Sequence, residues 1–278
     1  MLGRILVALV GIPLLILILF FSPVIVLTVV FAILCGIAAY ELLGATKAVH
    51  NRRLVVYAIV FAALVPFWYY FGCRATGAVA GVFVLVLLLF GEAIASQQTL
   101  KAEELAMTVF AALVVPSMLS VFVLMADMEH ARLYMFLPFV SAFTSDAFAL
   151  FAGMRFGKHK LAPKLSPKKT VEGSVGGFLG AALCCVLYGL VIQQALGHAP
   201  LYGMLALYGL LGSLVSQMGD LSFSYIKREY GIKDYGHLFG AHGGVLDRFD
   251  SVTFCAPLTY LLLMILPFFE YNAINMAV

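Results

Sequence analysis

The charged stretch 224–250 holds the residue types that could do chemistry. It reads SYIKREYGIKDYGHLFGAHGGVLDRFD and lies between two long apolar runs. Charge at the border of an apolar run is costly unless it binds something charged. The stretch combines cations, carboxylates and a glycine-rich turn at His242-Gly243-Gly244. Such a mixture suits a metal ion together with phosphate groups.

Two carboxylates in this stretch predict a metal site. Asp247 and Asp250 stand three residues apart at the start of the last apolar run, and this spacing places both on one face of a helix. They repel each other unless a cation lies between them, and Mg²⁺ is often held by one or two carboxylates plus substrate phosphates. Asp220, at the inner end of the preceding apolar run, is expected to be a third ligand. Helix capping, or pairing with Arg248, is the structural alternative.

Other carboxylates fall within or near apolar runs. Asp146, in SAFTSDAFALF, is expected to face a cavity or a partner. It could bind a metal, a substrate hydroxyl or a base amine, or it could pair with a lysine. Glu41 and Glu92 lie near the inner ends of predicted spans, where water is close, so a structural role is expected for each.

The segment 155–173, RFGKHKLAPKLSPKKTVEG, is rich in lysine. Lysines and hydroxyls bind phosphate, and a helix N-terminus adds backbone donors. Basic inner loops also orient membrane proteins and attract anionic lipids, so composition alone leaves phosphate binding and orientation equally open. The glycine pairs Gly173/Gly177 and Gly176/Gly180 predict close helix packing or a dimer face.

The composition indicates a polytopic membrane protein. Of the 278 residues, 63% are hydrophobic and 11% are charged, whereas soluble domains are about 45–50% apolar and about 25% charged. The apolar runs are continuous rather than alternating, which favours an all-α fold over a β-barrel. The net charge of +3 is too small to indicate a nucleic-acid partner. The five cysteines form no CxxC pair, so neither a zinc site nor a disulfide framework is indicated.

About nine transmembrane helices are predicted, each of about 20 apolar residues. They cover 5–21, 23–45, 54–71, 75–93, 105–126, 132–154, 174–195, 202–222 and 250–269. If the N-terminus is inside, every Lys and Arg except Arg74 and Arg132 falls on the inner side. The positive-inside rule therefore predicts a cytoplasmic N-terminus and a C-terminus on the opposite side.

This topology predicts a single membrane domain over 1–278. The helices of 1–130 carry weak functional signal, and the catalytic helices are expected in 131–278. The two charged loops, 155–173 and 223–249, are expected to face the cytoplasm, where nucleotides are.

The run from Ser224 to Asp250 resembles the signature of the phosphatidate cytidylyltransferases, also called CDP-diacylglycerol synthases. The family pattern is approximately S-x-hydrophobic-K-R-x4-K-D-x-G-x2-hydrophobic-G/P-x-H-G-G-hydrophobic-x-D-R-hydrophobic-D. It is met by Ser224, Ile226, Lys227, Arg228, Lys233, Asp234, Gly236, Phe239, Gly240, His242, Gly243, Gly244, Val245, Asp247, Arg248, Phe249 and Asp250. SPKKTVEG at 166–173 and Gly219-Asp220 are also similar to the family. The resemblance therefore covers essentially the whole chain.

The resemblance implies that CTP and phosphatidic acid react to give CDP-diacylglycerol and pyrophosphate. A divalent metal is required, either Mg²⁺ alone or Mg²⁺ with a second metal ion. It implies metal ligation by Asp220, Asp247 and Asp250, with Lys227 and His242 also catalytic. His242 alone could be a base, a phosphate donor or a turn residue; phosphatidate is already ionised near pH 7, which favours a donor or organiser. The implied substrate-binding residues are Asp146, Lys168, Lys169, Thr170, Ser224, Arg228, Lys233, Asp234, Gly243, Gly244 and Arg248.

The expected location is the bacterial cytoplasmic (inner) membrane, with the active site facing the cytoplasm. Membrane lipid is an expected partner, and a homodimer with a second copy of the chain is an open alternative. One alternative is a CTP-dependent transferase acting on another lipid phosphate. A lipid transporter is a more distant one, because the charges gather at the cytoplasmic border rather than along a midplane path.

Overall fold

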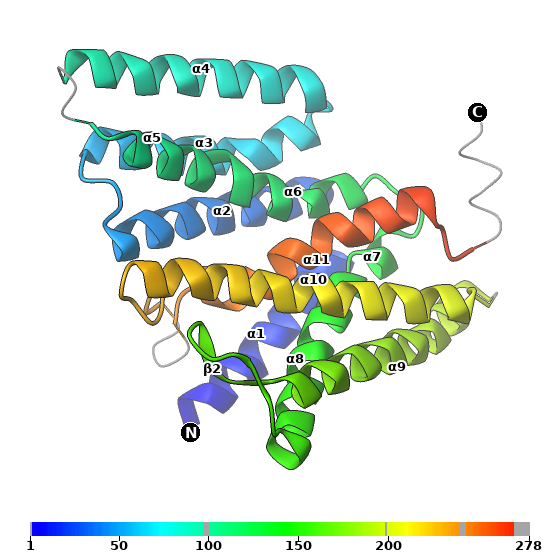
Figure 1. Ribbon diagram of the computed structural model, residues 1–278. Helices are drawn as coiled ribbons and strands as arrows, with labels where there is room; N and C mark the ends of the chain where they lie inside the picture. Colours follow the sequence, from blue (N-terminus) through cyan, green and yellow to red (C-terminus); the bar gives the residue numbers. More distant parts are fainter. Residues whose placement is uncertain (1, 97–99, 198, 239–242, 270–278) are drawn as a thin grey trace. The chain divides into compact units, whose positions relative to one another are not determined.

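The computed structural model describes residues 2–96, 100–197, 199–238 and 243–269, and helices make up most of them (Figure 1). Among these residues, seven helical segments are long and apolar enough to cross a membrane. They are Val24–Thr46, Arg52–Tyr70, Ala75–Ala95, Ala102–Met125, Ala131–Phe156, Val171–Leu196 and Leu246–Ile265. The prediction of a helical polytopic membrane protein is confirmed at this level.

Two predicted spans, 5–21 and 202–222, are helical but are not among the seven. They correspond to α1 (Leu2–Phe21) and α10 (Tyr202–Glu229). In α10, polar side chains such as Ser213, Gln217 and Asp220 interrupt the apolar pattern. The count of nine spans and the sidedness of the termini stay predictions.

The chain divides into two compact units. Unit 1 comprises residues 1–129 and 227–249, and unit 2 comprises residues 130–226 and 250–278. The boundary falls within α10 and again within α11 (Leu246–Ile265). Each unit is built by its own packing.

Unit 1 is a set of apolar helices. In addition to α1 it contains α2 (Val24–Thr46), α3 (Arg52–Tyr70), α4 (Arg74–Ala95), α5 (Ala102–Val109), the π-helix η1 (Phe110–Val114) and α6 (Val115–Met125). The helices α2 and α3 pack side by side, and α6 packs against both. Phe31 of α2 and Phe122 of α6 stack with ring centroids 4.9 Å apart, and both are fully buried. This aromatic pair packs α2 against α6.

Unit 2 contains α7 (Ala131–Tyr134), α8 (Leu137–Phe156), α9 (Val171–Leu196) and most of α10 and α11. Helices α8 and α9 pack closely against each other, with residues 145–153 of α8 against residues 173–180 of α9. A Cβ added at Gly176 would lie 2.2 Å from the Cβ of Ala152, and one at Gly180 would lie 2.1 Å from Phe148. The α9 glycines therefore mark close packing against α8, one of the two predicted alternatives. The homodimer stays a prediction.

The basic segment 155–173 contains a β-hairpin, which the all-α prediction missed. Strand β1 (Lys160–Ala162) pairs antiparallel with β2 (Ser166–Thr170). The strands are short and Pro167 lies within β2, so the alternation that identifies a strand is weak. Strand β2 leads directly into α9, where the hydroxyl of Thr170 accepts a hydrogen bond from the backbone N–H of Gly173 at 3.1 Å. Thr170 is thus the N-cap of α9. The hairpin fixes the lysines that precede Thr170.

Candidate active site

In unit 1, Asp247 organises the loop that precedes α11. One of its carboxylate oxygens accepts hydrogen bonds from the backbone N–H of Tyr235 at 2.7 Å and of Gly244 at 3.0 Å. The other accepts from the Lys227 ammonium at 2.9 Å. The side chains of Asp247 and Lys227 are only 3% and 10% exposed. Both oxygens of Asp247 are therefore engaged by donors of the protein, and the loop is fixed by them.

The turn before α11 requires glycine. Gly243 has φ of +79°, and a Cβ at this position would lie 2.7 Å from the Asp247 carboxylate. A side chain would therefore meet both backbone strain and a steric clash. Gly244 donates to Asp247 three residues later, as in a capping box. His242 lies outside the described residues.

Glu41 of α2 is a member of this site that sequence reasoning missed. Its two carboxylate oxygens accept hydrogen bonds from the backbone N–H groups of Val245 at 3.1 Å and Leu246 at 2.9 Å. Glu41 is 6% exposed, so it is buried rather than hydrated as the sequence suggested. The available signal was a single carboxylate in an apolar run. Glu92, by contrast, has the expected structural role, because it accepts from Arg53 and Tyr57.

The remaining charged residues of the loop differ in their exposure. Lys233 and Arg248 are exposed, and Asp234 is half-buried. Arg228 donates to the carbonyl of Ile232 at 3.1 Å, which closes the turn after α10. The exposed ammonium and guanidinium groups are the ones placed to meet a soluble anion.

Tyr230 ties the same turn to α5. Its hydroxyl donates to Glu103 at 2.8 Å. Burial is the larger cause and this hydrogen bond the next, and together they raise the pKa of Tyr230 to about 12. The phenol therefore stays protonated at neutral pH and keeps donating to the carboxylate.

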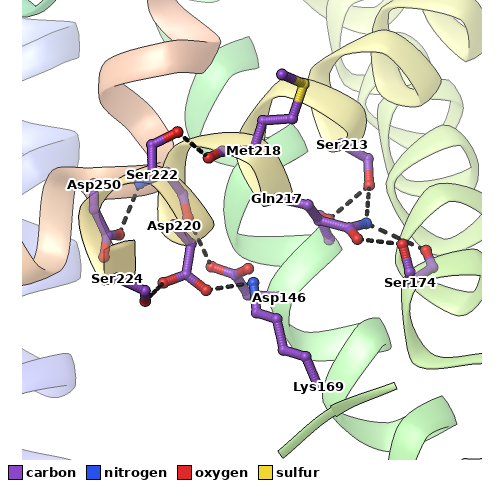
Figure 2. Close-up of polar contacts among 12 residues, drawn as sticks. Asp146, Lys169, Ser174, Ser213, Gln217, Met218, Asp220, Ser222, Ser224 and Asp250 are labelled. Carbon is purple, nitrogen blue, oxygen red and sulfur yellow. Dashed lines mark hydrogen bonds and ion pairs between the residues drawn. The ribbon is translucent and has the colours of Figure 1, made fainter. Parts of the chain in front are cut away.

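In unit 2, two predicted carboxylates, Asp146 and Asp220, lie at one lysine of the hairpin. Lys169 of β2 forms an ion pair with Asp220 of α10, and both side chains are about a quarter exposed, at 24% and 25%. Figure 2 shows the charged ends of Lys169, Asp146 and Asp220 pointing toward one another. The second oxygen of Asp220 accepts from the hydroxyl of Ser224 at 3.4 Å. Lys168, the preceding residue, is exposed.

The start of α11 brings Asp250 into this cluster. Asp250 is buried, and its carboxylate accepts from the backbone N–H of Ser251 at 2.7 Å. The hydroxyl of Ser251 donates to Asp146 at 3.4 Å. Gly219 lets α10 approach α11 closely here, because a Cβ on it would lie 2.9 Å from the carbonyl oxygen of Asp250. We call Asp146, Lys169, Asp220 and Asp250 the acidic cluster.

A network of neutral polar side chains supports the cluster (Figure 2). The Gln217 amide donates to Ser213 at 3.1 Å and to the carbonyl of Ser174 at 3.2 Å. Ser213 also bonds the hydroxyl of Ser145 at 2.6 Å. The network therefore cross-links α8, α9 and α10 beside the acidic cluster.

The oxygen atoms of the acidic cluster are of the ligand type that suits a hard cation such as Mg²⁺. Carboxylate and hydroxyl oxygens are the ligands that this ion prefers, and the Lys169 ammonium already lies where positive charge is needed. Within the described ranges, no three His, Cys, Asp or Glu side chains form a group ready to hold a metal. The metal set Asp220, Asp247 and Asp250 stays a prediction.

Comparison with known proteins identifies a family and several relatives that match much of the chain. A model described as "Cytidylyltransferase family" matches residues 2–266. A phosphatidate cytidylyltransferase of Bacillus subtilis (strain 168) is 33% identical over 232 residues, which cover 82% of this chain and 85% of the relative. Enzymes of the same name from Rickettsia prowazekii and Thermotoga maritima are each 37% identical, over 53% and 47% of this chain and 66% and 48% of their own lengths.

Proposed function

This chain belongs to the cytidylyltransferase family, and from this membership we infer that it transfers the cytidylyl group of CTP to phosphatidic acid. The products are CDP-diacylglycerol and pyrophosphate. The observation that carries this conclusion is the family match over residues 2–266, which includes both sites described above. The name shared by the relatives supplies the lipid substrate.

The reaction is a substitution at phosphorus between two anions. An oxygen of the phosphatidate phosphate forms a bond to the α-phosphorus of CTP, while the bond from that phosphorus to the pyrophosphate oxygen breaks. Phosphatidate is ionised near pH 7, so a general base is not required. Charge neutralisation and alignment are therefore the main tasks of the protein.

We assign the metal role first to the acidic cluster. Asp220 and Asp250, with Asp146 beside them, would hold Mg²⁺, which supplies positive charge to the phosphates when bound. The observation in support is the ion pair between Asp220 and Lys169, in which a positive charge already lies against the Asp220 carboxylate.

We assign phosphate binding to the exposed cations Lys168, Lys233 and Arg248. Lys227 is already committed to Asp247 in a buried pair. We therefore propose that Lys227 acts by holding Asp247 and the loop in place, a narrower role than the sequence suggested.

The membrane arrangement is part of the proposal. The distribution of Lys and Arg supports a cytoplasmic N-terminus and cytoplasmic charged loops, in the inner membrane of a bacterium. In a variant whose native cysteines are replaced, a cysteine introduced near Lys164 is expected to react with an impermeant reagent only from the cytoplasmic side. Labelling from the outside would invert the topology.

The function is tested with a substrate panel. Purified protein in detergent is mixed with Mg²⁺, radiolabelled CTP or another nucleotide, and a set of lipid phosphates. A radiolabelled lipid nucleotide is expected with CTP and phosphatidic acid. Preference for a polyprenyl or ether-lipid phosphate would support the alternative substrate. Absence of product across all lipids and metals would overturn the enzymatic assignment.

A further inference from the structure

Three segments of unit 1 meet at the carboxylate of Glu41. The residue lies near the C-terminal end of α2. Its oxygens accept from the backbone N–H groups of Val245, which directly precedes α11, and of Leu246, the first residue of α11. These residues are 204 and 205 positions away along the chain. The third segment is the loop at Gly236, which passes directly beside the Glu41 side chain.

Two glycines make this approach possible. A Cβ on Gly236 or on Gly244 would lie 2.3 Å from the nearest atom of the Glu41 carboxylate. At both positions the three nearest atoms all belong to Glu41. We call Glu41, Gly236, Gly244, Val245 and Leu246 the Glu41 seat. The loop is shaped around this one side chain.

The position of the carboxylate suits a helix start. Burying a carboxylate is costly unless its oxygens are hydrogen-bonded, and both oxygens of Glu41 are. The N-terminus of α11 presents unpaired N–H groups and the positive end of the helix dipole. Glu41 accepts hydrogen bonds from these N–H groups, and its negative charge complements the positive end of the dipole. It thereby fixes where α11 begins.

We propose that Glu41 is a positioning residue for cytidylyl transfer. This inference rests on the proposed function. Leu246 is followed directly by Asp247 and Arg248, so the anchoring of its N–H by Glu41 determines the placement of both side chains. Glu41 itself does not touch the substrate. A membrane-spanning helix with weak functional signal in its sequence thereby sets the geometry of the charged motif.

The first test measures turnover of purified Glu41→Ala per folded molecule. Misplacing catalytic groups by about 1 Å can cost about 100-fold in rate, so kcat should fall by up to that factor while KM for CTP changes little. Glu41→Gln should fall between the wild type and Glu41→Ala, because the amide retains one acceptor but presents an N–H to the second donor. Glu41→Asp, which keeps the charge, should restore part of the loss.

A matched control is Glu104 of α5. It is also buried, at 7% exposed, and it accepts from the backbone N–H of His50 at 3.1 Å. This partner, His50, is not part of the Glu41 seat. Glu104→Ala should lower thermal stability without lowering kcat per folded molecule.

The second test couples Glu41 to Gly236. Gly236→Ala should lower kcat because its Cβ meets Glu41, whereas the Glu41→Ala/Gly236→Ala double variant should be no slower than Glu41→Ala alone. Independent backbone requirements would instead give losses that multiply. Multiplying losses, or unchanged kcat in Glu41→Ala, would overturn the proposal.

A third readout does not depend on activity. Amide hydrogen exchange in the peptide covering 244–250 should be faster in Glu41→Ala than in the wild type, without any substrate. If the wild type itself made no lipid nucleotide, the proposed function would fail, while this exchange measurement would still report whether the seat exists. Equal exchange in both proteins would show that Glu41 does not anchor α11.

Discussion

The two charged regions of the molecule treat the same residue type in different ways. In the loop of unit 1, Asp247 is 3% exposed and accepts three hydrogen bonds between 2.7 and 3.0 Å. In the acidic cluster of unit 2, Asp220 is 25% exposed and contacts the Lys169 ammonium and a hydroxyl at 3.4 Å. One carboxylate is saturated by fixed donors, and the other has partners that can exchange.

This difference separates scaffolding from ligand binding. A buried carboxylate held by backbone N–H groups cannot give them up without leaving polar groups unsatisfied. A carboxylate that is a quarter exposed and paired with a lysine side chain can replace that lysine with a metal ion at smaller cost. The two aspartates are therefore expected to fail differently when they are mutated.

The largest effect is expected in the acidic cluster. Asp220→Asn should lower kcat by roughly 10²–10³-fold, the loss typical of removing one electrostatic contributor to a transition state. The melting temperature in detergent should change little, because Asp220 is partly exposed. Ser222→Ala, on the same helix, is the matched control, since its hydroxyl bonds only the carbonyl of Met218 among the recorded contacts. Near-normal turnover of Asp220→Asn would remove it from the metal set.

A comparable loss of turnover, with a loss of stability, is expected at Asp247. Asp247→Asn leaves the Lys227 ammonium buried without its carboxylate, and breaking one partner of a buried pair costs about 3–5 kcal/mol. Chemical denaturation and activity are measured together. The Lys227→Met/Asp247→Asn double variant should recover part of the stability but not the activity. Lost activity at unchanged stability would instead assign Asp247 a direct role in chemistry.

The sequence predicted one region better than the other. Asp146, Asp220 and Lys169 were proposed from their types and their places in or beside apolar runs, and the structure brings them together. For Asp247, residue type and i+3 spacing predicted a ligand, but they could not reveal the backbone donors of Tyr235 and Gly244. Hydrogen bonds to backbone N–H groups depend on how a loop folds and leave no trace in residue type.

The fold was predicted in a similar way. Long apolar runs identify helices because a span needs about 20 such residues. The hairpin of β1 and β2 was missed because its strands are short and β2 contains a proline, Pro167. The role of Glu41 was missed because its partners are backbone groups far along the chain.

A smaller effect is expected from the exposed cations of the loop. Lys233→Gln and Arg248→Gln should each raise KM for CTP about two- to fivefold, since an exposed charge contributes about 1 kcal/mol or less. The increase should shrink at high salt, where the wild type is also weakened. Lys101→Gln, an exposed lysine before α5, is the control and should leave KM unchanged. If KM for CTP rose equally in the Lys233, Arg248 and Lys101 variants, Lys233 and Arg248 would contribute only through the general positive charge of the protein.

The smallest effect is expected at Glu92, which serves as a comparison for Asp247 within unit 1. It lies in unit 1, as Asp247 does, but its partners are the exposed guanidinium of Arg53 at 3.2 Å and the hydroxyl of Tyr57 at 3.0 Å. Glu92→Gln should lower the free energy of unfolding by about 1 kcal/mol or less and leave kcat and KM unchanged. Steady-state kinetics and denaturation measure both. A marked loss of turnover would show that carboxylates in unit 1 matter by their charge near the helix ends, and not by their hydrogen bonds to the loop before α11.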